Sequence, residues 1–147
     1  MDIKIHTTPM KLERYSFLWS IIRLLLAAVA LFIGGYPVAL KIFPIPLTSS
    51  LLILCWLVSG IVSLYLVYRW NADGQKIFGK NETLDKVAFF VTVISGVNLG
   101  LVPILGTNIG MSISSNKMLF FVVGLIYLAC AYHLIKRWKA HGEKIFL

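Results

Sequence analysis

The sequence predicts an all-α polytopic membrane protein, a bundle of four transmembrane helices. Composition, four long apolar stretches and the distribution of cations lead to this prediction. Of the 147 residues, 59% are hydrophobic and only 14% are charged, and the mean hydropathy is +0.84. A soluble domain carries roughly 45–50% apolar and about 25% charged residues. These proportions exclude a soluble enzyme, a disordered chain and a cytosolic nucleic-acid binder, and the length suits a single membrane domain covering residues 1–147.

Four stretches are long and apolar enough to span a bilayer. A helix needs about 20 apolar residues to cross a hydrocarbon core of roughly 30 Å. None of the stretches alternates with the period of two that an outer-membrane strand requires, so helices are expected. The predicted spans are residues 16–35, 49–68, 87–106 and 118–137.

The cations predict the orientation, because loops on the cytoplasmic side of a membrane are enriched in Lys and Arg. With four spans, eleven of the 14 Lys and Arg residues fall on one face and two on the other, while Arg23 lies inside the first span. Both termini are therefore expected in the cytoplasm, and the plasma (inner) membrane is the expected location. The first face holds Lys4, Lys11, Arg14, Arg69, Lys76, Lys80, Lys86, Lys136, Arg137, Lys139 and Lys144, and the second holds Lys41 and Lys117.

The same charge distribution accounts for the net charge of +8. Since nearly every cation serves the orientation signal, nucleic acid is not an expected partner. The expected partners are the anionic headgroups of the bilayer and either a second copy of the chain or another membrane protein.

An internal repeat follows the second and fourth spans. Both end in the pattern R-W-x-A-x-G-x-K-I-F, and the two copies are separated by 68 residues. Two spans per unit predict parallel hairpin repeats, about 16–79 and 87–147, related by a pseudo-twofold axis along the membrane normal. The motif residues singled out are Arg69, Trp70, Lys76 and Phe78 in the first copy and Arg137, Trp138, Lys144 and Phe146 in the second.

These motifs have the composition of an interfacial anchor. Trp and Arg favour the headgroup zone, and after the glycine the Ile-Phe pair can dip into the interface. Orientation and anchoring is one interpretation of the motif. A cytoplasmic docking surface or lipid-headgroup site is the other.

A few polar residues inside the predicted spans are candidates for function. Arg23 either snorkels to the cytoplasmic face or contacts a buried anion. Asn98, with Thr92 and Ser95, lines either a helix-packing seam or a polar pathway, and the G-x-x-x-G of Gly96 and Gly100 predicts close helix approach. No Asp or Glu lies in a predicted span, so His133 is expected to be a hydrogen bonder and not part of a proton relay.

No pattern in the sequence predicts catalysis, a cofactor or a metal site. The two cysteines, Cys55 and Cys130, lie at different depths of their spans, so two free thiols are expected. The histidines have no metal-ligand spacing, and no phosphate loop or nucleophile triad is present. The chain is therefore not expected to be an enzyme.

In layout the chain resembles the GtrA-like proteins, which are small, have four spans and carry Arg, Trp and Phe after spans two and four. The resemblance implies a role in moving polyprenyl-linked sugars. The Phe here follows the Arg-Trp pair by eight residues, a wider spacing than that family's pattern, and no functional residue is transferred.

Two functions follow from the sequence. The first is an accessory or assembly subunit, or self-associating scaffold, of a membrane complex, as the small packing residues and the lack of catalytic groups indicate. The second is a small oligomeric transporter or a flippase for lipid-linked substrates. Whether Arg23, Asn98 and the Thr92/Ser95 face reach one cavity discriminates between them.

Overall fold

The chain folds into four long helices and two short ones, with no strand among residues 8–147, the part that the computed structural model describes. Each long helix is long and apolar enough to cross a membrane, which confirms the all-α, four-helix transmembrane fold. Lys4, one of the cations counted above, lies outside the described residues. The long helices are α2 (Pro9–Phe32), α4 (Pro46–Ala72), α5 (Thr83–Leu105) and α7 (Lys117–Ala140), and the short ones are α3 (Val38–Ile42) and α6 (Ile109–Ile113).

All four long helices extend several residues beyond the predicted spans at one end of the bundle. At the end of the bundle that carries the two R-W motifs, here called the motif end, α2 starts at Pro9 instead of residue 16 and α5 starts at Thr83 instead of residue 87. The predicted limits follow hydropathy alone, which stops at the first charges. Proline at the first helical position favours the earlier start of α2, because its φ is already helical. The extra turns include two carboxylates that form ion pairs, Glu13 in α2 and Asp85 in α5.

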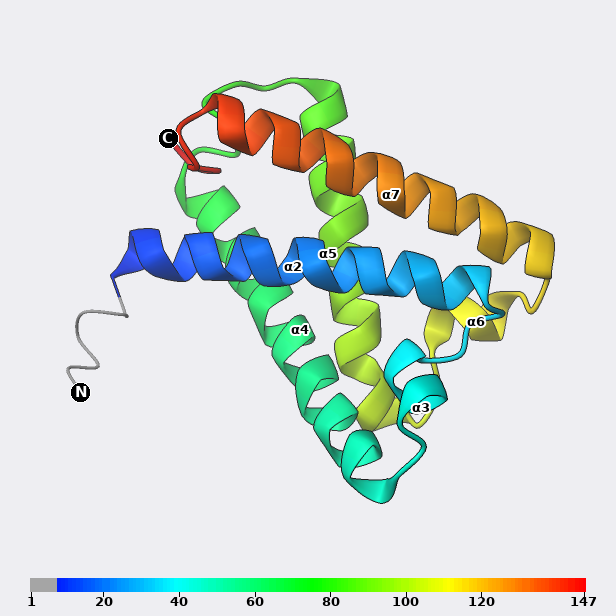
Figure 1. The fold of residues 1–147 in the computed structure, drawn as a ribbon. Helices are drawn as coiled ribbons and strands as arrows, with labels where there is room; N and C mark the ends of the chain where they lie inside the picture. The colour runs from blue at the N-terminus through cyan, green and yellow to red at the C-terminus, as the bar shows by residue number, and fades with distance from the viewer. Residues whose placement is uncertain (1–7) are drawn as a thin grey trace.

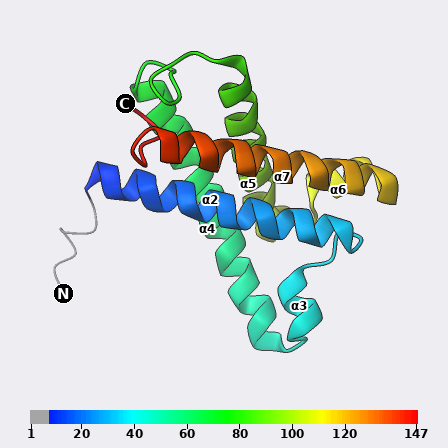
Figure 2. The ribbon, with the colours of Figure 1, turned by 45° about the horizontal axis from the view of Figure 1, so that its top comes forward.

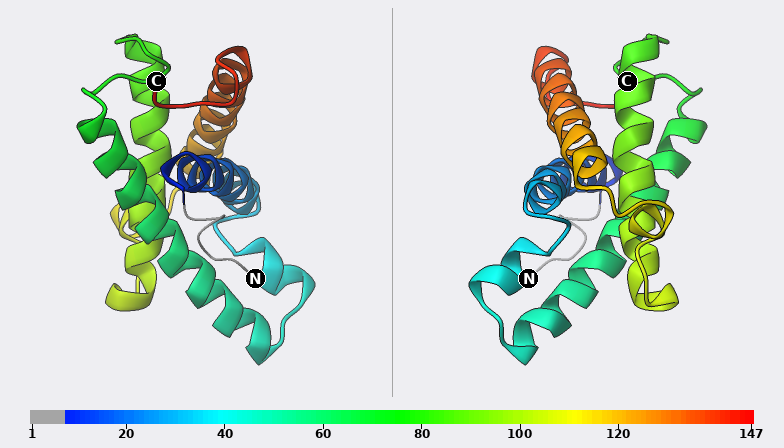
Figure 3. Two further views of the ribbon diagram at one scale, coloured as in Figure 1. Left: turned by 90° about the vertical axis from the view of Figure 1, so that its left-hand side faces the viewer. Right: turned by 90° about the vertical axis from the view of Figure 1, so that its right-hand side faces the viewer.

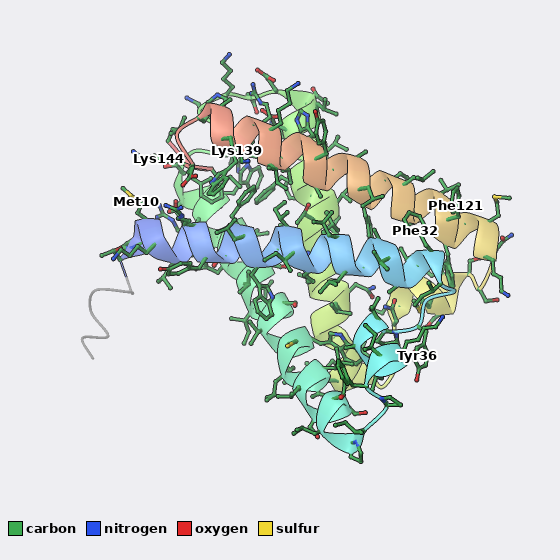
Figure 4. The ribbon with its side chains drawn as sticks, viewed as in Figure 1. Met10, Phe32, Tyr36, Phe121, Lys139 and Lys144 are labelled. Atoms are coloured by element: carbon green, nitrogen blue, oxygen red, sulfur yellow. The ribbon has the colours of Figure 1, made fainter. Side chains whose placement is uncertain are left out.

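The helices form two pairs that cross. Helix α2 lies alongside α7, and α4 lies alongside α5. Figure 2 shows the first pair in front of the second, and the left view of Figure 3, which looks nearly along α2, shows that the pairs are far from parallel. Helices α2 and α5 are central, since each packs on all the other long helices, while α4 and α7 are peripheral.

The tightly packed core lies in the motif half of the bundle. Beyond it the pairs diverge, and α3 and α6 occupy the opposite end, here called the α3/α6 end. There α2 and α7 still touch: the rings of Phe32 and Phe121 lie side by side, with centroids 5.4 Å apart, far from the motif-end residues Met10, Lys139 and Lys144. The buried apolar side chains are Phe17, Ile21, Leu24, Leu66, Ile77, Phe78, Ala88, Phe89, Val93, Cys130, Ala131, Leu134, Trp138, Ile145 and Phe146.

Glycines bring α4 and α5 into backbone contact. A Cβ on Gly100 would lie 2.5 Å from Cα of Gly60, closer than side chains tolerate. The close helix approach predicted from Gly96 and Gly100 is therefore confirmed, with Gly60 as the partner on α4. Such contacts take the place of the hydrophobic effect, which cannot drive helices together within lipid.

Prolines divide the connection between α2 and α4. The five-residue α3 lies between Pro37 and Pro44. Pro46 then occupies the first turn of α4, where its missing N–H costs no hydrogen bond.

Replacing Gly100 with alanine tests the α4–α5 contact. The added methyl group meets backbone that cannot rotate away, so Gly100→Ala is expected to lower the free energy of unfolding by about 1–3 kcal/mol. Thermal unfolding in detergent measures the effect. Gly110→Ala is the matched control, since a Cβ there meets only side-chain atoms, the nearest at 3.4 Å. Equal stability of Gly100→Ala and the unaltered chain would show that the helices are not in backbone contact.

Candidate functional site

A large cavity occupies the space where the two helix pairs diverge. Its volume is about 740 Å³, and all six helices contribute to its lining. Most of the lining is aliphatic or aromatic, with residues such as Leu26, Val38, Trp56, Leu99 and Phe120. A cavity of this size and character is typical of sites for small molecules.

Part of the cavity lining is exposed on the apolar surface of the bundle. Exposed side chains from α2, α3 and α4 form part of its lining, among them Ile22, Ile42 and Cys55. Ile22 lies thirteen residues after Pro9 and Cys55 nine residues after Pro46, so both are well inside their helices. This exposed, apolar border of the cavity is chemically suited to contact with acyl chains.

Arg23 places a charge in this apolar cavity. It lies fourteen residues after the start of α2, about 21 Å along the axis at 1.5 Å per residue. Its residue surface is only 6% exposed, so the side chain does not snorkel to the motif end. The guanidinium donates instead to two oxygens of α5, from Nη1 to Ser95 Oγ at 3.0 Å and from Nη2 to the Thr92 carbonyl at 2.7 Å.

The partners of Arg23 are neutral. None of the ion pairs formed by residues 8–147 includes Arg23, and its Nε has no hydrogen-bond partner within that range. A charged side chain at the centre of a membrane helix costs about 2.5–3.5 kcal/mol on insertion scales. The charge and the spare donor together favour an anion as an additional partner.

Gly96 makes room for this arrangement. A Cβ at this position would lie 1.9 Å from Ser63 Oγ and 3.1 Å from Arg23 Nη2. Ser63 of α4 and Arg23 of α2 therefore both reach α5 over the same glycine. The glycine predicted to serve helix packing also shapes the polar end of the cavity.

The sequence-predicted polar residues come together around this cavity. Arg23, Ser95 and Asn98 line it, while Thr92 is buried next to it and offers its carbonyl, with its hydroxyl donating to the Ala88 carbonyl at 2.9 Å. Asn98 holds the α3/α6 end, since its Nδ2 donates to Asn108 Oδ1 at 2.9 Å and its Oδ1 accepts from the Ile109 N–H at 3.1 Å. It therefore positions the connection to α6, which forms part of the cavity wall.

The arginines of the two motifs pair with carboxylates of neighbouring helices. Arg69 of α4 binds Glu13 of α2 through Nε and Nη2. Arg137 of α7 binds Asp85 of α5, with Nη2 2.7 Å from Oδ2 and Nε 3.0 Å from Oδ1. His133 completes the second group, because its Nε2 lies 2.7 Å from Asp85 Oδ1. Asp85 itself is fully buried, at 0% exposure.

The motif tails also differ from the expected interfacial position. Ile77, Phe78, Ile145 and Phe146 are buried in the core and do not dip into the membrane interface, because each tail turns back between the helices. The turn is the same in both copies: Gln75 N–H donates to the Trp70 carbonyl and Glu143 N–H to the Trp138 carbonyl, each at 2.9 Å. In both turns the glycine and the residue after it have positive φ: Gly74 and Gln75 in the first copy, and Gly142 and Glu143 in the second.

The two tails are also joined to each other by a backbone hydrogen bond. The Phe78 N–H donates to the Ile145 carbonyl at 2.8 Å. Trp138 packs on Phe17 with ring centroids 5.2 Å apart, and Trp70 is half-buried against Phe90 at 5.0 Å. Of the eight motif residues singled out from the sequence, Lys76 and Lys144 are the exposed ones.

Sequence reasoning missed Glu13 and Asp85, because both precede the predicted spans. The sequence does carry a signal for them. Each repeat has an acidic residue just before its first span and an Arg at the end of its second. Glu13 precedes Arg69 by 56 residues and Asp85 precedes Arg137 by 52. With the helices extended to Pro9 and Thr83, these pairs become the natural partners.

Comparisons with family models, curated proteins and solved structures find no match for this chain. The resemblance to GtrA-like proteins therefore stays one of layout. Any function has to be inferred from the geometry of the site.

Asp85→Asn tests the buried ion pair. The change leaves Arg137 with Glu82 alone, 3.2 Å away, and is expected to cost roughly 3 kcal/mol of stability, the lower end of the range for breaking a buried pair. Glu143→Gln is the matched control, because its pair with Arg14 has side chains 43% and 50% exposed and is expected to contribute less than about 1 kcal/mol. Unfolding in detergent measures both, and equal losses would contradict the structural role of Asp85.

Proposed function

We propose that this protein is a small membrane carrier that binds a lipid with an anionic headgroup and moves it between the leaflets. The observation that carries the proposal is Arg23, a buried cation with neutral partners in an apolar cavity whose lining is partly exposed on the apolar surface of the bundle. The cation suits a phosphate or a similar anion, and the apolar walls suit an acyl or isoprenoid chain. An aqueous anion would gain nothing from such an apolar border.

The cavity also changes the expected need for oligomerisation. The transporter expected from the sequence is an oligomer. The volume of about 740 Å³ within one chain supports a carrier whose binding site lies in a single subunit. A homo-oligomer is then not needed for the binding step.

The proposal includes the predicted topology. It places the motif end in the cytoplasm of a cell with a plasma (inner) membrane, as the excess of cations there favours. It also derives the two hairpins from a duplication. The matching turns after α4 and α7 and the matching Arg–carboxylate pairs support this origin.

The second candidate function is an accessory or scaffold subunit of a membrane complex. The two peripheral helices favour this function because most of their apolar surface is exposed. Only 22% of the 18-residue apolar stretch of α4 and of α7 is buried, against 39% for α2. Native mass spectrometry of protein gently extracted from its own membrane, without overexpression, tests this candidate. A stoichiometric protein partner would support it, whereas a chain that carries only a lipid would favour the carrier.

Arg23→Gln tests the anion site. We expect the purified variant to retain at least tenfold less radiolabelled phosphatidylglycerol than the unaltered protein, a loss of about 1.4 kcal/mol. Arg23→Lys should be intermediate, because it keeps the charge but loses the planar fork. Arg14→Gln removes one charge from an exposed position and should change retention less than twofold.

The same variants test movement. In proteoliposomes, the unaltered protein should accelerate the exchange of fluorescent phosphatidylglycerol between leaflets, and Arg23→Gln should abolish the acceleration. Phosphatidylglycerol retention that is equal in Arg23→Gln and the unaltered protein would contradict the proposal. Release of the lipid by millimolar inorganic phosphate would assign the site to an aqueous anion instead.

A further inference from the structure

The buried group around Asp85 differs from the other ion pairs of the bundle. Glu13 with Arg69, and Arg14 with Glu143, each join one acid to one permanently charged base. Asp85 instead accepts from Arg137 and is also bonded to the imidazole of His133, whose charge changes near neutral pH. The sequence excluded a proton relay only because no carboxylate fell in a predicted span, and Asp85 lies inside α5.

We propose that His133 and Asp85 form a proton-binding site that controls the affinity of the Arg23 cavity for its lipid. This inference rests on the proposed function. The proton comes from water at the motif end and binds Nδ1 of His133, while the Nε2–H stays donated to Asp85 Oδ1. An O–H bond of hydronium breaks as the Nδ1–H bond forms, which leaves water, and release of the proton reverses this exchange.

One permanent cation and two carboxylates surround His133. Arg137 divides its guanidinium between Asp85 and Glu82, at 2.7 and 3.2 Å, so one permanent cation faces two carboxylates. A proton on His133 supplies a second positive charge next to the more deeply buried carboxylate. Lys80 approaches Glu82 only on its exposed side, at 3.7 Å, where water screens the interaction.

Two charged groups of α2 at this end belong to other ion pairs. From α2, Glu13 binds Arg69 of α4, and Arg14 binds Glu143 of the C-terminal tail. His141, the other histidine of the motif end among residues 8–147, stacks on Phe78 at 5.2 Å and bonds to the Arg137 carbonyl. His133 is therefore the imidazole that is bonded to a buried carboxylate.

Helix α5 connects the proton site to the anion site. Asp85 and Thr92 lie on the same buried face of this helix, two turns or about 10 Å apart. The helix is tied to α7 through Asp85 and to α2 through Thr92 and Ser95, the two residues that hold Arg23. A charge on His133 strengthens the tie to α7 and so biases the position of the groups that bind Arg23.

The test combines two measurements on the full chain between pH 5.5 and 8. Histidine NMR signals follow the protonation of His133, and retention of radiolabelled phosphatidylglycerol, a phosphodiester whose charge is constant over this range, follows the cavity. His133→Gln keeps a donor for Asp85 but cannot take up a proton. His141→Gln is the matched control, because it removes the histidine that does not contact Asp85.

We expect lipid retention to change at least fivefold between pH 5.5 and 8, together with the NMR signal of His133. His133→Gln should retain the lipid equally at every pH, and His141→Gln should behave like the unaltered protein. The same pH profile in His133→Gln and the unaltered protein would overturn the proton site and leave the proposed function intact. Absence of Arg23-dependent retention at every pH would overturn both.

Discussion

Every charge that enters the membrane part of this protein has to be stabilised there, and the structure follows from how each charge meets that requirement. Arg69 and Arg137 meet it with carboxylates of neighbouring helices, Glu13 and Asp85. Arg23 meets it with a hydroxyl and a backbone carbonyl. The Arg–carboxylate pairs close one end of the bundle. The neutral partners of Arg23 leave its charge able to bind an anion.

The closed end gives the molecule its shape. Each Arg–carboxylate pair ties the two helices of one hairpin, and the turned-back tails join the hairpins through the bond between Phe78 and Ile145. With the helix pairs fixed at the motif end and crossing there, they diverge toward α3 and α6 (Figure 1). The cavity is the consequence of this divergence, and Arg23 lies where the pairs begin to separate. Function and fold are thus linked by the same buried charges.

Much of this architecture could be predicted from the sequence. Four helices follow from hydropathy, and the close α4–α5 contact follows from Gly96 and Gly100. The sequence did not predict whether Arg23, Ser95 and Asn98 lie at one cavity. Their grouping depends on how the helix pairs cross, and no local sequence pattern determines that crossing. Glu13 and Asp85 were missed because hydropathy ends a span at its first charge, although a paired charge can extend the helix. The burial of Phe78 and Phe146 depends on a tertiary contact that composition assigns equally well to the membrane interface.

The most direct test of the account is whether a lipid phosphate touches the Arg23 guanidinium in a bilayer. Solid-state NMR dephasing between the ³¹P of phosphatidylglycerol and ¹⁵N-labelled arginine side chains measures this contact. We expect a short-range ³¹P–¹⁵N signal that disappears in Arg23→Gln and persists in Arg14→Gln. If Arg23→Gln leaves the ³¹P–¹⁵N signal unchanged, the charge in the cavity does not bind a lipid phosphate and the central claim fails.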